Sequence, residues 1–296
     1  MLVSRSPEAD FYFEARYRWS ATCLHMELNR RNRQVSQSFL GSNSESILAQ
    51  ARIAIIGLSG GGSHVALQLA HVGAGNFVVV DYDHVEARNL NRMVGATARD
   101  ARLGTLKTSV IRRVIKRVNP RAKVLAVSKK WQEEAEYLRD CDVVFGCVDT
   151  FSERQQLEAA ARRYLIPYID IGMDVSTVDD GFSIGGQVAL SMPGELCLRC
   201  YGILTDERLN REAAQYGAAG GGPQVVWANG VLASTAVGIF VQLFCPWRNR
   251  QLRGLLREYD GESHTVSTSN KMAYLETTRC AHFSDTSSLG DPFWKS

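Results

Sequence analysis

The sequence RIAIIGLSGGGSHVALQLAHVGAGNFVVVDYDHVEARNLNR, residues 52–92, predicts the fold of this chain. It opens with a short β-branched run, residues 52–56, which is typical of a strand buried on both faces of a parallel sheet. Gly57, Gly60 and Gly62 then allow the backbone to turn sharply and to approach a phosphate, and the helix that follows offers unpaired N-terminal amides. The pattern indicates either a nucleotide-binding turn or a plain tight turn between a strand and a helix.

An acidic residue and a polar loop come directly after the second predicted strand. Residues 77–80 form that strand, and Asp81 closes it at the position where a carboxylate can accept a ribose hydroxyl. A dehydrogenase would need little beyond this carboxylate. The loop instead carries side chains suited to phosphate and metal binding, namely Asp83, Glu86, Asn89, Asn91 and Arg92.

Two further segments extend the predicted sheet. Lys107 lies in the first turn of a helix that begins after residue 104, and its charge opposes the helix dipole, so an anionic partner is expected. Residues 123–127 read as a third strand, and residues 141–149 read as another buried strand that ends in Asp149. Because the carboxyl ends of parallel strands line the ligand crevice, Asp81 and Asp149 are expected at the same edge.

The bulk composition is that of an ordinary globular protein. The 296 residues are 45% hydrophobic and 22% charged, and the net charge of +3 is too balanced to imply nucleic-acid binding by itself. Seven unevenly spaced cysteines and an acidic start without a signal-peptide pattern favour a reducing, cytoplasmic location. The apolar residues 225–244 contain polar side chains that suit a buried or interfacial helix, so no membrane span is expected.

Several motifs together resemble one known family. In order they are GLSGGG at 57–62, DYDHVEARNLNR at 81–92, GTLK at 104–107, RVNP at 117–120 and CVDT at 147–150. This series is similar to that of the ThiF/MoeB/HesA family, the adenylyltransferases related to ubiquitin-activating enzymes. The Arg-Gln pair at 33–34 resembles that family's N-terminal arm, and CLRC at 197–200 resembles half of its zinc site. The resemblance covers roughly residues 31–282 and rests on the order of the motifs.

The element order and the resemblance predict an α/β fold. We expect a doubly wound, mostly parallel, Rossmann-like sheet with a C-terminal antiparallel extension, since residues 253–276 alternate like two or three strands. The predicted domains are an N-terminal helical arm at 1–50, a ThiF-like adenylation domain at 51–284 and a loose tail at 285–296.

The resemblance implies adenylation of a carboxylate. In that family the C-terminal carboxylate of a ubiquitin-like or sulfur-carrier protein, which ends in Gly-Gly, attacks the α-phosphorus of ATP and expels pyrophosphate. Arg33 would reach the phosphates of a second subunit, which implies a homodimer or a paired heterodimer. By the same resemblance the nucleotide and Mg²⁺ site would comprise Gly57, Gly60, Gly62, Asp81 at the ribose, Asp83, Asn89 at the polyphosphate, Arg92 and Lys107 at the phosphates, and Asp149 at magnesium.

Simpler roles remain open for these residues. Asp81 and Asp149 would also serve as helix caps, and Arg92 as a surface ion pair. Ser59 replaces a glycine of the family pattern and places a Cβ where the backbone should pass close to the nucleotide.

The cysteines leave a zinc site open. The second Cys-x-x-Cys pair of the family is missing, but Cys197, Cys200, Cys280 and His282 offer the four ligands of a structural Zn²⁺. The alternative is that they are reduced core residues. The loop at 201–222 contains no cysteine, so adenylation is expected to proceed without a covalent thioester on that loop.

Three other functions remain open. Adenylation of a carboxylate on modified tRNA is one, with phosphate contacts from Arg30, Arg31, Arg112, Arg113, Lys116 and Arg117. A catalytically silent partner subunit is the second, supported only by Ser59 and the incomplete zinc pairs. An NAD-dependent oxidoreductase is the third, and it would leave Arg92, Lys107 and Asp149 without a purpose.

Overall fold

The computed structural model describes residues 35–214, 223–247, 252–275 and 278–283. Within them the predicted N-terminal arm contributes a 3-10 helix, η1 (Val35–Leu40), and α2 (Ser44–Gln50). Arg33 and the predicted tail at 285–296 lie outside the described residues. The limits of the three predicted domains therefore stay predictions.

The described residues form one eight-stranded sheet in the order β3-β2-β1-β4-β5-β6-β7-β8. Strands β3, β2, β1, β4 and β5 run parallel, and β5 to β8 pair antiparallel. The predicted parallel sheet with an antiparallel extension is therefore confirmed. The strands are β1 (Arg52–Ile56), β2 (Asn76–Val80), β3 (Lys123–Val127), β4 (Val143–Gly146), β5 (Tyr168–Val178), β6 (Gly181–Ser191), β7 (Leu255–Asp260) and β8 (Thr265–Thr268).

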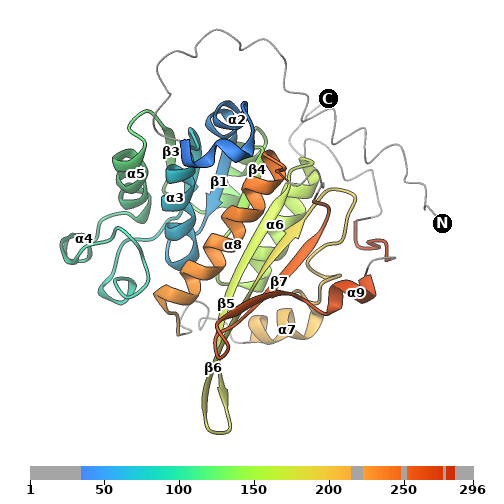
Figure 1. Ribbon diagram of the computed structural model, residues 1–296. Helices are drawn as coiled ribbons and strands as arrows, with labels where there is room; N and C mark the ends of the chain where they lie inside the picture. Colours follow the sequence, from blue (N-terminus) through green and yellow to red (C-terminus); the bar gives the residue numbers. More distant parts are fainter. Residues whose placement is uncertain (1–34, 215–222, 248–251, 276–277, 284–296) are drawn as a thin grey trace.

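Helices cover both faces of the sheet (Figure 1). One core contains buried residues of α3 (Gly60–Val72), α5 (Lys107–Val118) and α8 (Val226–Phe244). A second core, on the opposite face, contains those of η3 (Trp131–Leu138) and α6 (Phe151–Arg163). The short remaining helices are η2 (Ala87–Asn89), α4 (Ala98–Leu103), α7 (Asp206–Ala214) and α9 (Lys271–Leu275).

Helix α8 is the one helix of the described residues long and apolar enough to pass a test for a membrane span. Half of it is buried, and it packs against α3, β5 and β6. Its Asn229 is only 4% exposed and donates a hydrogen bond to the Val225 carbonyl. The same helix therefore serves as a core element of the α/β fold, as the polar side chains within it indicate.

The turn between β1 and α3 requires glycine at two positions. Gly57 has a φ of +85°, and a Cβ there would lie 2.4 Å from the Cys147 carbonyl oxygen. A Cβ on Gly62 would lie 1.8 Å from the Gly57 carbonyl oxygen. The backbone at Gly57 thus lies closer to the segment after β4, and to the first turn of α3, than any side chain at Gly57 or Gly62 would permit.

Strands β5 and β6 form a long hairpin that the sequence reasoning missed. Each strand has 11 residues, and they pair continuously from Tyr168↔Ser191 to Val178↔Gly181. Alternation from residue 173 onward and the Asp-Asp-Gly turn at 179–181 were the available signals. The predicted C-terminal strands are present as β7 and β8, and α9 follows them.

We predict opposite effects of alanine at two helical glycines. Gly62→Ala should lower the free energy of unfolding by about 1–3 kcal/mol, because its Cβ must displace the Gly57 carbonyl. Gly238→Ala should raise it by about 0.5–1 kcal/mol, because nothing lies within 4 Å of its Cβ position in α8. Urea unfolding checks both, and equal midpoints for Gly62→Ala and the wild type would contradict the close approach.

Candidate functional site

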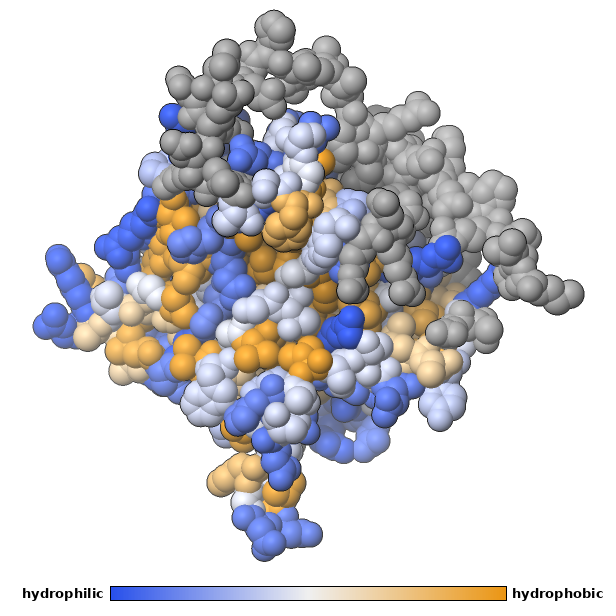
Figure 2. Space-filling model, in the orientation of Figure 1, coloured by the Kyte–Doolittle hydropathy of each residue, from blue (hydrophilic) through white to orange (hydrophobic). Residues whose placement is uncertain are grey.

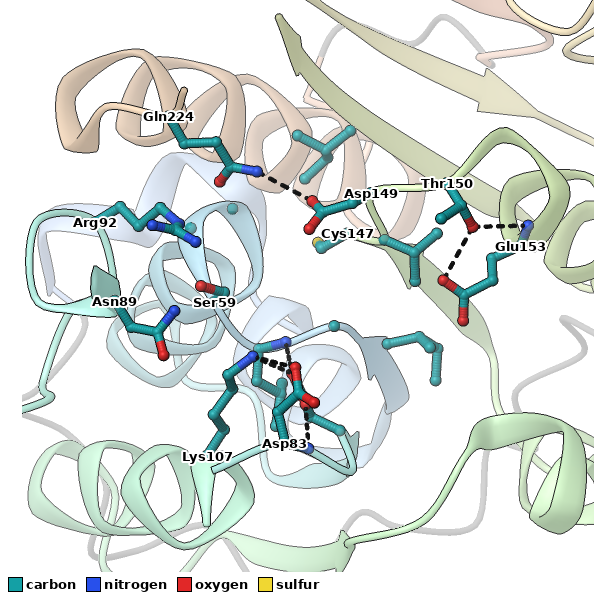
Figure 3. A pocket seen from close by; sticks show the side chains of 18 of the residues that line it. Ser59, Asp83, Asn89, Arg92, Lys107, Cys147, Asp149, Thr150, Glu153 and Gln224 are labelled. Atoms are coloured by element: carbon teal, nitrogen blue, oxygen red, sulfur yellow. Dashed lines mark hydrogen bonds and ion pairs between the residues drawn. The ribbon is translucent and has the colours of Figure 1, made fainter. Parts of the chain in front are cut away.

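A pocket of about 690 Å³ lies at the carboxyl ends of the parallel strands (Figure 3). Its volume is in the range of sites that bind small molecules and cofactors. Of the residues predicted for the nucleotide site, those that line it are Gly57, Gly60, Asp81, Asp83, Asn89, Arg92, Lys107 and Asp149. Gly62 does not line the pocket, and its role is to let the first turn of α3 pack against the Gly57 carbonyl.

Asp81 fixes the glycine turn to the end of β2. Its Oδ2 accepts a hydrogen bond of 2.8 Å from the Leu58 amide, and its Oδ1 accepts one of 2.9 Å from the Asp83 amide. Burial raises the pKa of this carboxyl, and the nearby Lys107 ammonium opposes that rise. Asp81 therefore binds backbone amides on both sides, while each oxygen keeps a further acceptor position.

Lys107 finds its anionic partner within the protein. Its Nζ lies 2.7 Å from Asp83 Oδ2 and 3.7 Å from Asp81 Oδ2. The lysine is only 6% exposed, so the two carboxylates offset a charge that would be costly to bury alone. The anion expected near this helix start is thus Asp83, and a bound phosphate would have to share the ammonium with it.

Arg92 and Asn89 present donors to the pocket from one loop. Asn89 Oδ1 accepts a hydrogen bond of 2.9 Å from the Glu86 amide, which leaves its NH₂ group as the free end of that side chain (Figure 3). Arg92 Nη1 donates to the Arg88 carbonyl oxygen at 2.7 Å. Arg92 Nε and Ser59 Oγ are buried atoms without a hydrogen-bond partner in the described structure. Unsatisfied buried donors of this kind suit an anionic ligand atom that accepts from them.

Ser63 ties the glycine turn to the Arg92 loop. The residue is fully buried, and its Oγ donates to the Gly60 carbonyl oxygen at 2.9 Å. The same Oγ accepts a hydrogen bond of 3.0 Å from the Val94 amide. One hydroxyl therefore sets the position of Arg92, two residues before Val94, relative to the start of α3.

Asp149 points into the pocket and caps no helix. Gln224 Nε2 donates to its Oδ1 at 3.0 Å (Figure 3). The cap of α6 is made by Thr150, whose side chain accepts from the Glu153 amide. A single carboxylate of this kind, completed by phosphate oxygens and water, is a usual Mg²⁺ environment.

The first amides of α6 are held by a residue from another helix. The Glu212 carboxylate of α7 accepts hydrogen bonds of 2.7 and 2.9 Å from the Phe151 and Ser152 amides. Because the cap is complete without Asp149, the alternative of a helix-capping Asp149 is wrong.

The four proposed zinc ligands come together outside the pocket. Ligand atoms of Cys197, Cys200, Cys280 and His282 all lie within 4.8 Å of one another. The His282 Nδ1 lies 3.4 Å from Cys197 Sγ and 3.5 Å from Cys200 Sγ. The pKa of the Cys280 thiol is lowered to about 4, and the main reason is a hydrogen bond from Cys197. Three sulfurs and one imidazole nitrogen are a ligand set that fits a structural Zn²⁺.

The pocket also contains residues that sequence reasoning did not predict. Gln224 and Asn229 follow the glycine-rich segment, and Met173 and Asp174 come from the missed hairpin. Further lining residues that were not predicted include Tyr82, which follows β2, Lys129, Lys130 and Trp131, which follow β3, and Glu153 of α6. A basic-aromatic run directly after the third predicted strand was the available signal for the group at 129–131.

Cys147 is the one cysteine among the described residues that line the pocket. Burial raises the pKa of this thiol far above its usual range. A buried, protonated thiol is a poor nucleophile. In the described part of the loop at 201–222 no cysteine is present either, so the expectation of adenylation without a thioester stays a prediction.

The chain is similar to a known protein family and to individual proteins. The model of the ThiF family matches residues 31–280. The sulfur carrier protein ThiS adenylyltransferase of Escherichia coli is 33% identical over 177 residues, which are 58% of this chain and 66% of that protein. The tRNA threonylcarbamoyladenosine dehydratase of Haemophilus influenzae is 33% identical over 128 residues, 42% of this chain and 48% of that protein. Both matches thus span less than two thirds of the relative.

Among solved structures, E. coli MccB with ATP superimposes with a TM-score of 0.66 at 20% identity. The superposition covers 81% of this chain and 71% of MccB. At this identity the likeness establishes the fold, and it confirms the predicted Rossmann-type architecture.

We predict that Ser63→Ala destabilises the protein. The Val94 amide would lose its acceptor, which should lower the free energy of unfolding by about 1–3 kcal/mol. Ser234→Ala is the matched control, because the Ser234 hydroxyl is exposed and bonds only to its own helix at Gly230; its effect should stay within about 0.5 kcal/mol. Chemical denaturation measures the free energy of unfolding of both variants. Equal effects of the two substitutions would contradict a stabilising hydrogen bond between Ser63 and the Val94 amide.

Proposed function

The chain belongs to the ThiF family, and we propose on that basis that it is an ATP-dependent adenylyltransferase that acts on the C-terminal carboxylate of a ubiquitin-like or sulfur-carrier protein. One observation carries the proposal. Arg92, Lys107 and Asp149 converge on a single pocket beside the glycine turn. A phosphate-binding turn, two cations and a metal-binding carboxylate are the groups that this reaction needs.

In the proposed reaction a carboxylate oxygen attacks the α-phosphorus of ATP. A new oxygen–phosphorus bond forms, the bond to the bridging oxygen of the β-phosphate breaks, and pyrophosphate leaves. Both reactants are anions, so their approach needs positive charge beside the phosphates. Arg92, with its unpartnered Nε, and Lys107, shared with Asp83, would supply it, while Asp81 would hold the ribose and Asn89 the polyphosphate.

Asp149 would hold a Mg²⁺ ion, which supplies charge compensation for the phosphates when bound. Its free oxygen faces the pocket, while Gln224 orients the other. Arg33 of a second copy would complete the site, so a homodimer or paired heterodimer forms part of the proposal. A cytoplasmic location also stays a prediction.

A tRNA carboxylate is the second candidate substrate. One matched relative is named as a tRNA-modifying enzyme, and α5 carries basic residues. However, Arg113 is already paired with Asp100 at 2.7 Å, and Lys116 donates to the Pro120 carbonyl oxygen. A steep loss of tRNA affinity with salt would favour this candidate over the carrier protein.

We predict carrier-dependent exchange of labelled pyrophosphate into ATP. Asp149→Ala should lower the exchange rate on the order of 10²-fold, because the Mg²⁺ ligand is lost. Asp140→Ala is the control, since Asp140 is an exposed aspartate that pairs with Arg52 away from the pocket; its exchange should equal that of the wild type.

The assay would be run with candidate partners that end in Gly-Gly and with tRNA. ATP binding without exchange in any of these mixtures would contradict the proposal and favour a silent partner subunit. Binding of a nicotinamide cofactor in place of ATP would favour an oxidoreductase.

We also predict that protein purified without added metal carries about one equivalent of zinc. Cys280→Ser should remove most of this zinc, whereas Cys245→Ser should retain it because Cys245 is a buried core residue distant in sequence from the cluster. Metal analysis of the three proteins is the measurement. Less than about a tenth of an equivalent in the wild type would show that the cysteines are reduced core residues.

A further inference from the structure

The hairpin of β5 and β6 extends beyond the rest of the sheet (Figure 1). On one side, β4 pairs with β5 only as far as Asp170. On the other side, β7 pairs with β6 only from Gly185 onward. Among the described residues, no backbone pairs with the β4-side edge of β5 from residue 171 to its end at Val178.

The register identifies which groups this edge presents. Val178 and Gly181 close a two-residue turn, so this pair exchanges both of its backbone hydrogen bonds, and the pairs then alternate along the hairpin. Consequently Met173, Val175 and Thr177 direct their amides and carbonyls away from β6. Consistent with this phase, the carbonyl oxygen of Ile184, the cross-strand partner of Val175, accepts from the Gly261 amide on the outer side of β6.

The free edge begins at the pocket. Ile171, Met173 and Asp174 line it, and Asp149 follows the end of the neighbouring β4. Strand β5 runs outward from this point. A polypeptide that places its C-terminal carboxylate in the pocket must therefore approach antiparallel to β5, which is the direction of an added antiparallel strand.

The hairpin exposes both acidic and apolar side chains. Asp174, Asp179 and Asp180 are exposed, and residues 172–184 contain no lysine or arginine. Near the tip, Phe182 is 74% and Val178 is 49% exposed. Figure 2 shows hydrophobic and hydrophilic surface side by side on the segment that protrudes at the bottom of the view. Natural proteins commonly protect an open strand edge with lysine, proline or a covering element, and this edge carries neither of those residues. An isolated two-stranded hairpin is only marginally stable in water, so a bound strand would stabilise it.

We propose that the free edge of β5 binds the extended, basic C-terminal tail of the polypeptide substrate as an added antiparallel strand. The inference rests on the proposed function, because the pocket at the end of the edge is taken to be the site of adenylation. From Met173 to Val178 the strand offers about 17–20 Å of edge, which matches about six residues of extended tail. Main-chain hydrogen bonds give the tail its affinity, and the three aspartates select a positively charged one.

The test uses synthetic peptides of about twelve residues that end in Gly-Gly, with either arginine or glutamate at alternate upstream positions. Their binding to the full chain is measured by fluorescence anisotropy without ATP. Thr177→Pro removes an outward amide and should weaken binding of the arginine peptide about tenfold. Thr177→Val keeps the amide and should bind as the wild type does.

A double variant tests the charge without altering the edge. Asp179→Asn with Asp180→Asn should weaken binding of the arginine peptide and reduce the salt dependence of that binding, because two of the three negative charges are removed. Equal affinities of the two Thr177 variants, or of the arginine and glutamate peptides, would overturn the proposal. So would a change from dimer to monomer in Thr177→Pro, because a second copy would then be the occupant of the edge.

The two proposals fail in different ways. Edge-dependent peptide binding without any pyrophosphate exchange would leave the docking intact and contradict adenylation. Exchange that is insensitive to Thr177→Pro would leave adenylation intact and contradict docking on β5.

Discussion

The close approach of backbone segments at the end of β1 governs the whole site. The Gly57 and Gly62 backbones pass within reach of the Cys147 and Gly57 carbonyls, where no Cβ fits. That contact brings the end of β4 next to the turn, and the Asp81 carboxylate adds the end of β2 through the Leu58 amide. Three strand ends thus meet at one point, and the pocket exists because they meet there.

Some of the cationic and donor groups in the pocket are already paired within the protein, and others are unpaired in the described part of the chain. Lys107 is neutralised by two carboxylates, whereas the Arg92 Nε and the Ser59 hydroxyl have no hydrogen-bond partner among the described residues. A polyphosphate would satisfy those donors and compete with Asp83 for the lysine. The departure of Ser59 from the family's glycine therefore does not remove the turn. The Ser59 Cβ is tolerated, and the Ser59 hydroxyl adds a hydrogen-bond donor beside the turn.

Much of this could be predicted from the sequence, because the signals were local. Periodicity and glycine spacing located β1, β2, β3 and β4, which are four of the five parallel strands. The motif series predicted a ThiF-family fold, which the comparisons confirm. The β5–β6 hairpin was missed because its tip is packed on one partner strand only, so no clear apolar run marks it. Gln224 and Glu212 were missed because their partners are distant in the sequence. Glu212 contacts Phe151, 61 positions away, and Gln224 contacts Asp149, 75 positions away, and no local pattern encodes such contacts.

The central claim is that a carboxylate attacks the α-phosphorus of ATP in this pocket. The most direct test uses a Gly-Gly peptide whose terminal carboxylate carries oxygen-18, with mass spectrometry of the nucleotide after hydrolysis of the product. The account predicts one labelled oxygen in AMP and none in pyrophosphate, since the carboxylate oxygen becomes bonded to the α-phosphorus. Label in inorganic phosphate with formation of ADP, or ATP consumption without label in AMP, would contradict it.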